Sequence, residues 1–176
     1  MKTKKIILLG YMGSGKTSVG NLLNKKINYE FSDLDKFIEN KNKLSITSIF
    51  KTKGEIYFRN EERNALEELI NDDTPMIISL GGGTPCYHNT MEYLNSFDQV
   101  KTFYLKTGTI SLTKRLKSEK NIRPLISHLK NSKEIEEFVG KHLFERNVFY
   151  SKSDFKINTD GKSIEEITSE LQSLLT

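Results

Sequence analysis

The sequence predicts an α/β domain in which helices cover both faces of a five-stranded parallel sheet. Short apolar runs alternate along the chain with longer stretches of helical periodicity, which is typical of strand–helix–strand units. A glycine-rich loop joins the first apolar run to the first helical stretch. The 176 residues contain no internal repeat and no Pro/Gly/Ser-rich linker, so we expect a single domain over residues 1–176.

Five apolar runs have the length and the β-branched or aromatic character of buried strands. We expect these strands at residues 5–9, 29–32, 76–80, 100–105 and 154–157. Between them, Leu, Ile, Val and Phe recur at spacings of three and four residues, as they do on the buried face of a helix. This periodicity predicts helices at residues 17–27, 36–42, 46–51, 54–70, 111–117, 133–149 and 163–175.

Composition excludes several classes of protein. Hydrophobic residues make up 36% of the chain, which is enough for a packed core and excludes disorder over most of its length. The net charge of +4 is small for this length, so we expect no nucleic-acid partner. No apolar run approaches the roughly 20 residues that span a bilayer, and we expect neither membrane insertion nor export. Cys86 is the single cysteine, which favours a cytoplasmic location.

Residues 10–17, GYMGSGKT, match the phosphate-loop pattern G-x-x-x-x-G-K-[ST] between a predicted strand and a predicted helix. The alternative, a glycine turn that binds nothing, is disfavoured by this setting. Consecutive backbone N–H groups of such a loop converge on phosphate at a helix N-terminus. Lys16 would neutralise the β- and γ-phosphate oxygens, and the Thr17 hydroxyl would contact Mg²⁺. The predicted nucleotide-binding residues here are Gly13, Ser14, Gly15, Lys16, Thr17 and Ser18.

The sequence favours ATP over GTP, because no Asn-Lys pair is followed by the aspartate of a guanine-binding N-K-x-D pattern. The strand predicted at residues 76–80 runs into three glycines, with no acid at its end that could serve the metal. Asp33 and Asp35 follow the second strand, and strand alternation would point both the same way. One carboxylate could serve Mg²⁺ through water while the other orients or deprotonates a hydroxyl. Alternatively, either aspartate only caps the next helix.

Only five of the 27 basic residues are arginines, and the planar guanidinium binds carboxylates and phosphates in a way that lysine does not. A triple glycine follows the strand at residues 76–80, where a ring could lie directly on the backbone. Phe50 and Phe58 could line a pocket, although aromatic residues at helical positions are more often part of a core.

Several segments, in this order and spacing, resemble the shikimate kinase family. They are residues 10–17, the Asp33-x-Asp35 pair, F-R-x-x-E at 58–62, SLGGG at 79–83, RPL at 123–125 and R-x-x-x-Y at 146–150. The likeness spans most of the chain and is most specific between Arg59 and Gly83. Pro85 stands where the family often has an aliphatic residue, and Val148-Phe149 where Pro-Leu is common; these departures concern loop shape and not charged groups.

The resemblance implies the P-loop fold of nucleoside monophosphate kinases, with a substrate-binding segment at residues 33–60 and a lid at 116–130. It implies an ATP- and Mg²⁺-dependent enzyme that phosphorylates the 3-hydroxyl of shikimate. The products are shikimate 3-phosphate and ADP, on the route to chorismate and the aromatic amino acids. A cytoplasmic monomer with shikimate and ATP as its partners is the expected form.

The resemblance also implies roles for individual residues. Asp35 is the expected base and contacts the shikimate hydroxyls, and Asp33 is an outer-shell magnesium ligand. The catalytic set is Asp35, Lys16 and Arg123, and the shikimate-binding set is Asp35, Arg59, Gly81, Gly82, Gly83 and Arg146. Arg123 would reach the transferring phosphoryl group from the lid, and Arg115 would stack on the adenine.

Two other functions remain open from the sequence. Another small-metabolite kinase of this fold, such as a gluconate kinase, would also need a cation for a carboxylate. A regulatory module that senses ATP without phosphorylating a metabolite would need neither the Asp35 base nor the paired arginines.

Overall fold

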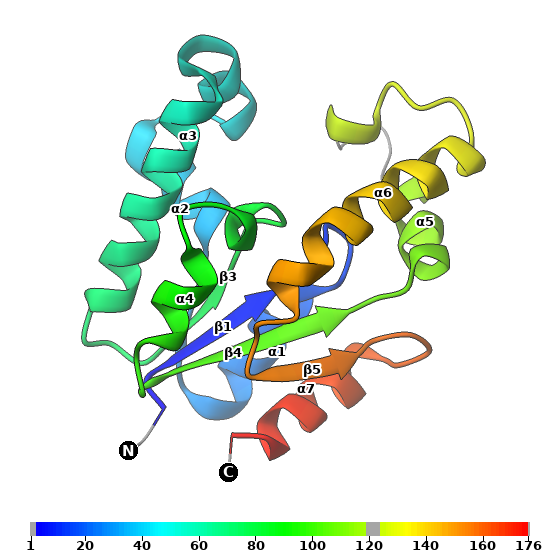
Figure 1. Ribbon diagram of the computed structural model, residues 1–176. Helices are drawn as coiled ribbons and strands as arrows, with labels where there is room; N and C mark the ends of the chain where they lie inside the picture. Colours follow the sequence, from blue (N-terminus) through cyan, green and yellow to red (C-terminus); the bar gives the residue numbers. More distant parts are fainter. Residues whose placement is uncertain (1–2, 119–123, 176) are drawn as a thin grey trace.

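The computed structural model describes residues 3–118 and 124–175. Its centre is a five-stranded parallel sheet with the strand order β2-β3-β1-β4-β5. Figure 1 shows this sheet between the surrounding helices. The strands are β1 (Lys5–Leu9), β2 (Glu30–Asp33), β3 (Met76–Ser79), β4 (Val100–Lys106) and β5 (Phe155–Asn158). The predicted fold class is therefore confirmed, and the strand boundaries differ from the predicted ones by one residue at most at each end.

Seven helices lie in the described part of the chain, together with two short 3₁₀ segments. They are α1 (Lys16–Ile27), α2 (Leu34–Asn42), α3 (Ile46–Asn71), α4 (Thr90–Asn95), α5 (Thr109–Ser118), α6 (Ser132–Tyr150) and α7 (Ile164–Ser173), with η1 (Thr84–Cys86) and η3 (Pro124–Ile126). The sequence analysis missed α4 and η1, because pieces of six and three residues are too short to establish a helical period. No helix in this part of the chain has the length and apolar character needed to cross a bilayer.

Alternating residues of the strands divide the core between the two faces of the sheet. Ile7 and Ile78 lie in a cluster with apolar residues of α2, α3 and α4. Ile6 and Ile77 face the other way and pack against α1 and α7. This alternation places a helical layer on each face, as Figure 1 shows.

The two helices predicted at residues 46–51 and 54–70 form one continuous element, α3, which is kinked at Gly54. Gly54 has φ 83° and ψ 172°, a conformation that glycine adopts readily and other residues do not. The kink changes the direction of the chain before the helix that carries Phe58 and Arg59.

A third cluster joins the phosphate loop to the helices beyond the sheet edge. It contains Tyr11, Leu112, Leu116, Ile126, Ile135 and Val139, all buried. Leu116, the first residue of the expected lid, lies within α5, and η3 lies within the same expected segment. Arg123 lies outside the described residues, so the lid and the role of this arginine stay predictions.

Candidate active site

The phosphate loop leads from the buried strand β1 into the N-terminus of α1. Gly13 and Gly15 have φ values of 81° and 98°, in the left-handed region where glycine avoids the strain of a β-carbon. Lys16 Nζ donates to the backbone carbonyls of Gly10 and Tyr11 at 2.9 and 3.1 Å, so its side chain folds back across the loop. The loop and the helix N-terminus together have the geometry of a binding site for an anionic group.

A cavity of about 550 Å³ opens over this loop. Gly13, Gly15, Lys16, Thr17, Ser18 and Arg115 line it, as the sequence analysis expected of nucleotide-binding residues. Arg115 Nη1 donates to the carbonyl of Gly13 at 2.9 Å, which holds this guanidinium at the cavity edge. Ser14, also expected there, is buried within the loop, and among the described residues its Oγ has no hydrogen-bond partner.

The sequence analysis missed three residues that line the same cavity, namely Lys162, Ser163 and Ile164. They lie in the turn from β5 into α7, at the carboxyl end of β5 and next to that of β4. Their one sequence signal is this position, because loops at the carboxyl edge of a parallel sheet are where ligands bind.

Asp33 lies at the end of β2 and has two contacts. Its carboxylate caps α2 by accepting from the backbone N–H of Lys36 at 3.3 Å, but this is not its only contact, so Asp33 does more than cap the helix. The other oxygen accepts from Thr17 Oγ1, also at 3.3 Å. A hydroxyl and a carboxylate are hard oxygen donors of the kind that Mg²⁺ prefers, so the pair fits this ion beside the phosphate loop.

Asp35 lies in the first turn of α2 and not in a strand, so strand alternation does not place it. It nevertheless lines the same cavity as Asp33. Burial raises the pKa of Asp35 to about 6; the negative charges of Asp33 and Glu62 add to this rise, and Lys16 partly offsets it. A carboxylate with a raised pKa is a stronger base than an exposed one.

A second cavity, of about 310 Å³, adjoins the first and shares Asp35, Gly81 and Gly82 with it. Arg59, Gly83 and Arg146 also line it, so the structure brings the whole predicted acceptor set together. The triple glycine follows β3, and the carbonyl of Gly82 accepts from Tyr150 Oη at 2.5 Å. This contact ties the glycine loop to the end of α6.

Phe50 and Phe58 both line the second cavity, with ring centroids 4.6 Å apart. Phe58 also belongs to the hydrophobic core and is only 3% exposed, whereas Phe50 is 37% exposed. Phe58 therefore belongs to both the core and the cavity wall, which were the two alternatives for these residues. Phe50 lines the cavity.

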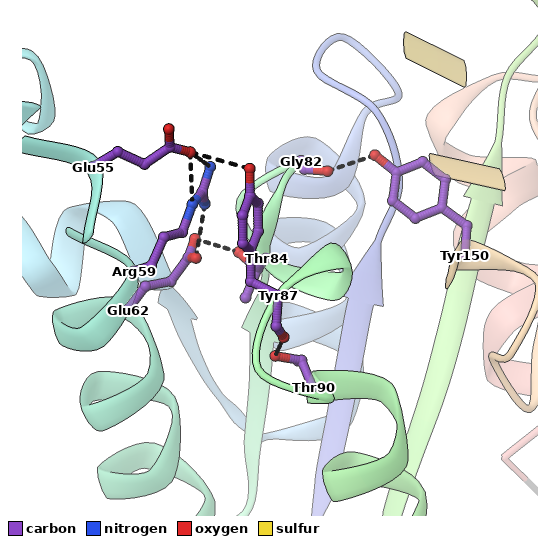
Figure 2. A network of polar contacts seen from close by, with 8 residues as sticks. All are labelled: Glu55, Arg59, Glu62, Gly82, Thr84, Tyr87, Thr90 and Tyr150. Carbon is purple, nitrogen blue, oxygen red and sulfur yellow. Dashed lines mark hydrogen bonds and ion pairs between the residues drawn. The ribbon is translucent and has the colours of Figure 1, made fainter. Parts of the chain in front are cut away.

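Arg59 is surrounded by polar and aromatic groups, as Figure 2 shows. Its Nη1 donates to Glu62 Oε2 at 2.9 Å, and Glu62 Oε1 accepts from Thr84 Oγ1 at 2.6 Å. Burial lowers the pKa of Arg59, but the attraction and hydrogen bond of Glu62 outweigh this, so the net direction is upward. Glu62, Thr84 and Tyr87 had no assigned role in the sequence analysis, because only the tertiary structure brings Thr84 to Glu62 and Tyr87 to Arg59.

Arg146 projects from α6 toward the glycine loop. A β-carbon at Gly82 would lie 3.6 Å from Arg146 Nη1, which is ordinary contact distance. Its guanidinium also lies 5.5 Å from the ring centroid of Tyr11, a residue of the phosphate loop. One arginine from α3 and one from α6 therefore approach the same cavity from different sides.

Comparisons with known proteins agree with this arrangement. A family model described as shikimate kinase matches residues 12–176. A shikimate kinase of Flavobacterium psychrophilum is 45% identical over 172 residues, which are 98% of this chain and 99% of the relative. The crystal structure of shikimate kinase from Bacteroides thetaiotaomicron superimposes with a TM-score of 0.88 at 35% identity and covers 97% of both chains.

A shikimate kinase from Acinetobacter baumannii, solved in complex with shikimate, superimposes with a TM-score of 0.85 at 29% identity. The match covers 98% of this chain and 93% of that one. With a family model over nearly the whole chain and relatives of this similarity, the chain belongs to the shikimate kinase family.

Proposed function

We propose that this protein transfers the γ-phosphoryl group of ATP to the 3-hydroxyl of shikimate, giving shikimate 3-phosphate and ADP. The observation that carries the proposal is the position of Asp35 on the wall common to two cavities. One cavity contains the phosphate loop, and the other contains two arginines for a carboxylate. Family membership identifies shikimate as the acceptor and ATP as the co-substrate.

The larger cavity takes ATP. Backbone N–H groups at the N-terminus of α1 bind its phosphates, and Lys16 neutralises charge on the β- and γ-phosphates. Arg115 lines this cavity together with Lys162, Ser163 and Ile164, and the adenine stacks on its guanidinium. Mg²⁺ bound by Thr17, and through water by Asp33, would neutralise phosphate charge during transfer.

The smaller cavity takes shikimate. Arg59 and Arg146 bind its carboxylate, and the backbone of Gly81, Gly82 and Gly83 contacts its ring. Asp35 faces the 3-hydroxyl and accepts its proton as the oxygen attacks the phosphoryl group. Arg123, in the lid of residues 116–130, stabilises charge on the transferring group and excludes water when the lid closes.

One chain supplies the residues of both cavities, and we propose a monomer as the active form. ATP and Mg²⁺ are available in the cytoplasm, where we place the activity. Size-exclusion chromatography coupled to light scattering tests whether the protein is a monomer.

The deciding experiment measures ADP release by the purified protein with Mg²⁺ and ATP in the presence of shikimate, gluconate or a nucleoside monophosphate. Stimulation by shikimate alone supports the proposal. Stimulation by gluconate or the nucleotide would show that this compound, and not shikimate, is the acceptor. A protein that binds ATP but responds to none of the three would be a regulatory module.

A further inference from the structure

Tyr87 lies against the arginine that is proposed to bind the shikimate carboxylate. The Cζ atom of Arg59 is 3.9 Å from the centroid of the Tyr87 ring, which is a close cation–π distance. The Tyr87 hydroxyl donates to Glu55 Oε1 at 3.0 Å. The same Glu55 oxygen lies 3.4 Å from both Nε and Nη2 of Arg59. Tyr87 thus contacts the guanidinium with its ring and, through Glu55, secures one edge of it.

The opposite side of this arrangement is held by the buried Glu62, which accepts from both Arg59 and Thr84. Figure 2 shows Arg59 enclosed by Glu55, Glu62 and the Tyr87 ring. The Arg59 side chain is only 13% exposed, although Glu55 is 55% exposed and Tyr87 is 39% exposed. Neighbouring protein groups therefore shield most of the Arg59 side chain from solvent.

The Tyr87 ring is carried by an ordered turn. The backbone N–H of Tyr87 donates to the carbonyl of Thr84 at 3.4 Å, and its own carbonyl accepts from the backbone N–H and Oγ1 of Thr90 at 3.0 and 2.7 Å. The next residue, His88, has φ 52°, and its carbonyl accepts from Arg63 Nη1 at 3.1 Å. Contacts on both sides of Tyr87 therefore determine where its ring lies.

An arginine side chain has several rotatable bonds, and a ligand that immobilises it loses affinity through the lost freedom. A guanidinium that is already held in place binds a carboxylate without this loss. We propose that Tyr87 is a positioning residue that holds Arg59 ready for the shikimate carboxylate. This inference rests on the proposed function for the identity of the ligand, and on the contacts above for the role of the tyrosine.

The inference predicts a change in substrate capture and not in the chemical step. Tyr87→Leu removes the aromatic face and the hydroxyl, and we expect the KM for shikimate to rise roughly 5- to 20-fold. The kcat and the KM for ATP should stay within about twofold of wild type, because Tyr87 lines neither cavity. Tyr87→Phe keeps the ring over Arg59 and should restore the KM to within about threefold of wild type.

Tyr93 provides a matched control. Its ring lies 3.8 Å from Cζ of Arg63, an arginine of the same helix that lines neither cavity. Tyr93→Leu removes an equivalent stack and should leave both KM values unchanged. Thermal unfolding of all three variants shows whether they are folded at the assay temperature.

A second readout does not depend on turnover. The Nε–H resonance of Arg59, assigned by its disappearance in Arg59→Lys, reports the order of this side chain in ¹H–¹⁵N spectra. We expect a dispersed, slowly exchanging signal in wild type and in Tyr87→Phe, and a shifted, rapidly exchanging one in Tyr87→Leu. The signal should be unaffected by Tyr93→Leu.

An unchanged shikimate KM together with an unchanged Arg59 resonance in Tyr87→Leu would overturn the inference. So would an equal loss in Tyr87→Leu and Tyr93→Leu, since this would indicate a general effect on the fold. If wild type lacks shikimate-dependent ADP release, the proposed function fails, and the resonance alone then decides whether Tyr87 orders Arg59.

Discussion

Gly83 faces the guanidinium of Arg59 so closely that a β-carbon at this position would lie 3.1 Å from Nη2 and 3.2 Å from Nη1. The absence of a side chain at Gly83 therefore leaves room for the guanidinium in its observed position at the smaller cavity. The buried Glu62 holds the other side of the guanidinium, so Arg59 has little room to retreat.

Gly83→Ala should therefore displace Arg59 and raise the KM for shikimate by roughly tenfold, with a smaller effect on the KM for ATP. Steady-state kinetics with each substrate varied in turn measures this. Gly140→Ala is the matched control, because it lies in α6 with no close neighbour nearer than 3.9 Å. It should leave the kinetics unchanged and stabilise the fold by about 0.5–1 kcal/mol through helix propensity. Equal kinetic effects of the two substitutions would contradict the role given to Gly83.

Asp35→Asn should reduce kcat by at least about 100-fold, because an amide cannot accept the proton of the attacking hydroxyl. The affinity for ATP should change only a few-fold. Nucleotide titration by calorimetry and the ADP-release assay measure the two quantities separately. Normal turnover by this variant would remove Asp35 from the mechanism.

The same substitution should stabilise the protein at neutral pH. The folded-state pKa of Asp35, about 6, lies above its ordinary value of 3.8. The folded state thus favours the protonated form, and this favourable contribution is present below pH 3.8 and lost as the pH rises through 6. Above that pH the buried charge costs about 3 kcal/mol, which Asn does not incur.

Thermal unfolding without nucleotide or metal should show the Tm of Asp35→Asn exceeding that of wild type by several degrees at pH 7.5. The difference should shrink as the pH falls toward 4. Asp98→Asn removes an exposed carboxylate and serves as the control. A Tm difference that is constant with pH would show that the charge of Asp35 is not its source.

Arg59→Lys should raise the KM for shikimate by more than about tenfold while preserving the charge, because an ammonium group lacks the planar pair of donors. Arg63→Lys alters the neighbouring arginine of α3, which lines neither cavity; the lysine can still donate to the carbonyl of His88, so this KM should stay within about twofold. Shikimate saturation curves at saturating ATP compare the two. An unchanged KM in Arg59→Lys would place the carboxylate elsewhere.

Thr17→Val should raise the Mg²⁺ concentration needed for half-maximal activity, because it removes the proposed hydroxyl ligand and the 3.3 Å contact with Asp33. Thr17→Ser retains the hydroxyl and should behave much like wild type. Magnesium titrations at fixed ATP, begun from protein treated with a chelator, provide the comparison. Identical titration curves for the valine and serine variants would exclude Thr17 as a ligand.

Local sequence alone determined the strands, most of the helices and the phosphate loop. Strand β1, the loop and the start of α1 are contiguous, so one stretch of chain contains the periodicity, the glycines and Lys16 that specify their shape. The break at Gly54 was predicted in the same way, since one predicted helix ends at residue 51 and the next begins at Gly54. The short helix α4 was not, because six residues carry too weak a pattern.

Which residues come together in the candidate active site was decided only by the tertiary structure. Arg59 and Arg146 are far apart in the sequence and line one cavity only because α3 and α6 pack into the same core cluster on one face of the sheet. The burial that raises the pKa of Asp35, the contribution of Glu62 to that rise and the stack of Tyr87 on Arg59 likewise depend on parts of the chain that are distant in sequence. Burial, charge interactions and side-chain contacts act through space, so tertiary packing determines them. Helix and strand periodicity depends on residues that are close together in the sequence, so the sequence alone predicts it.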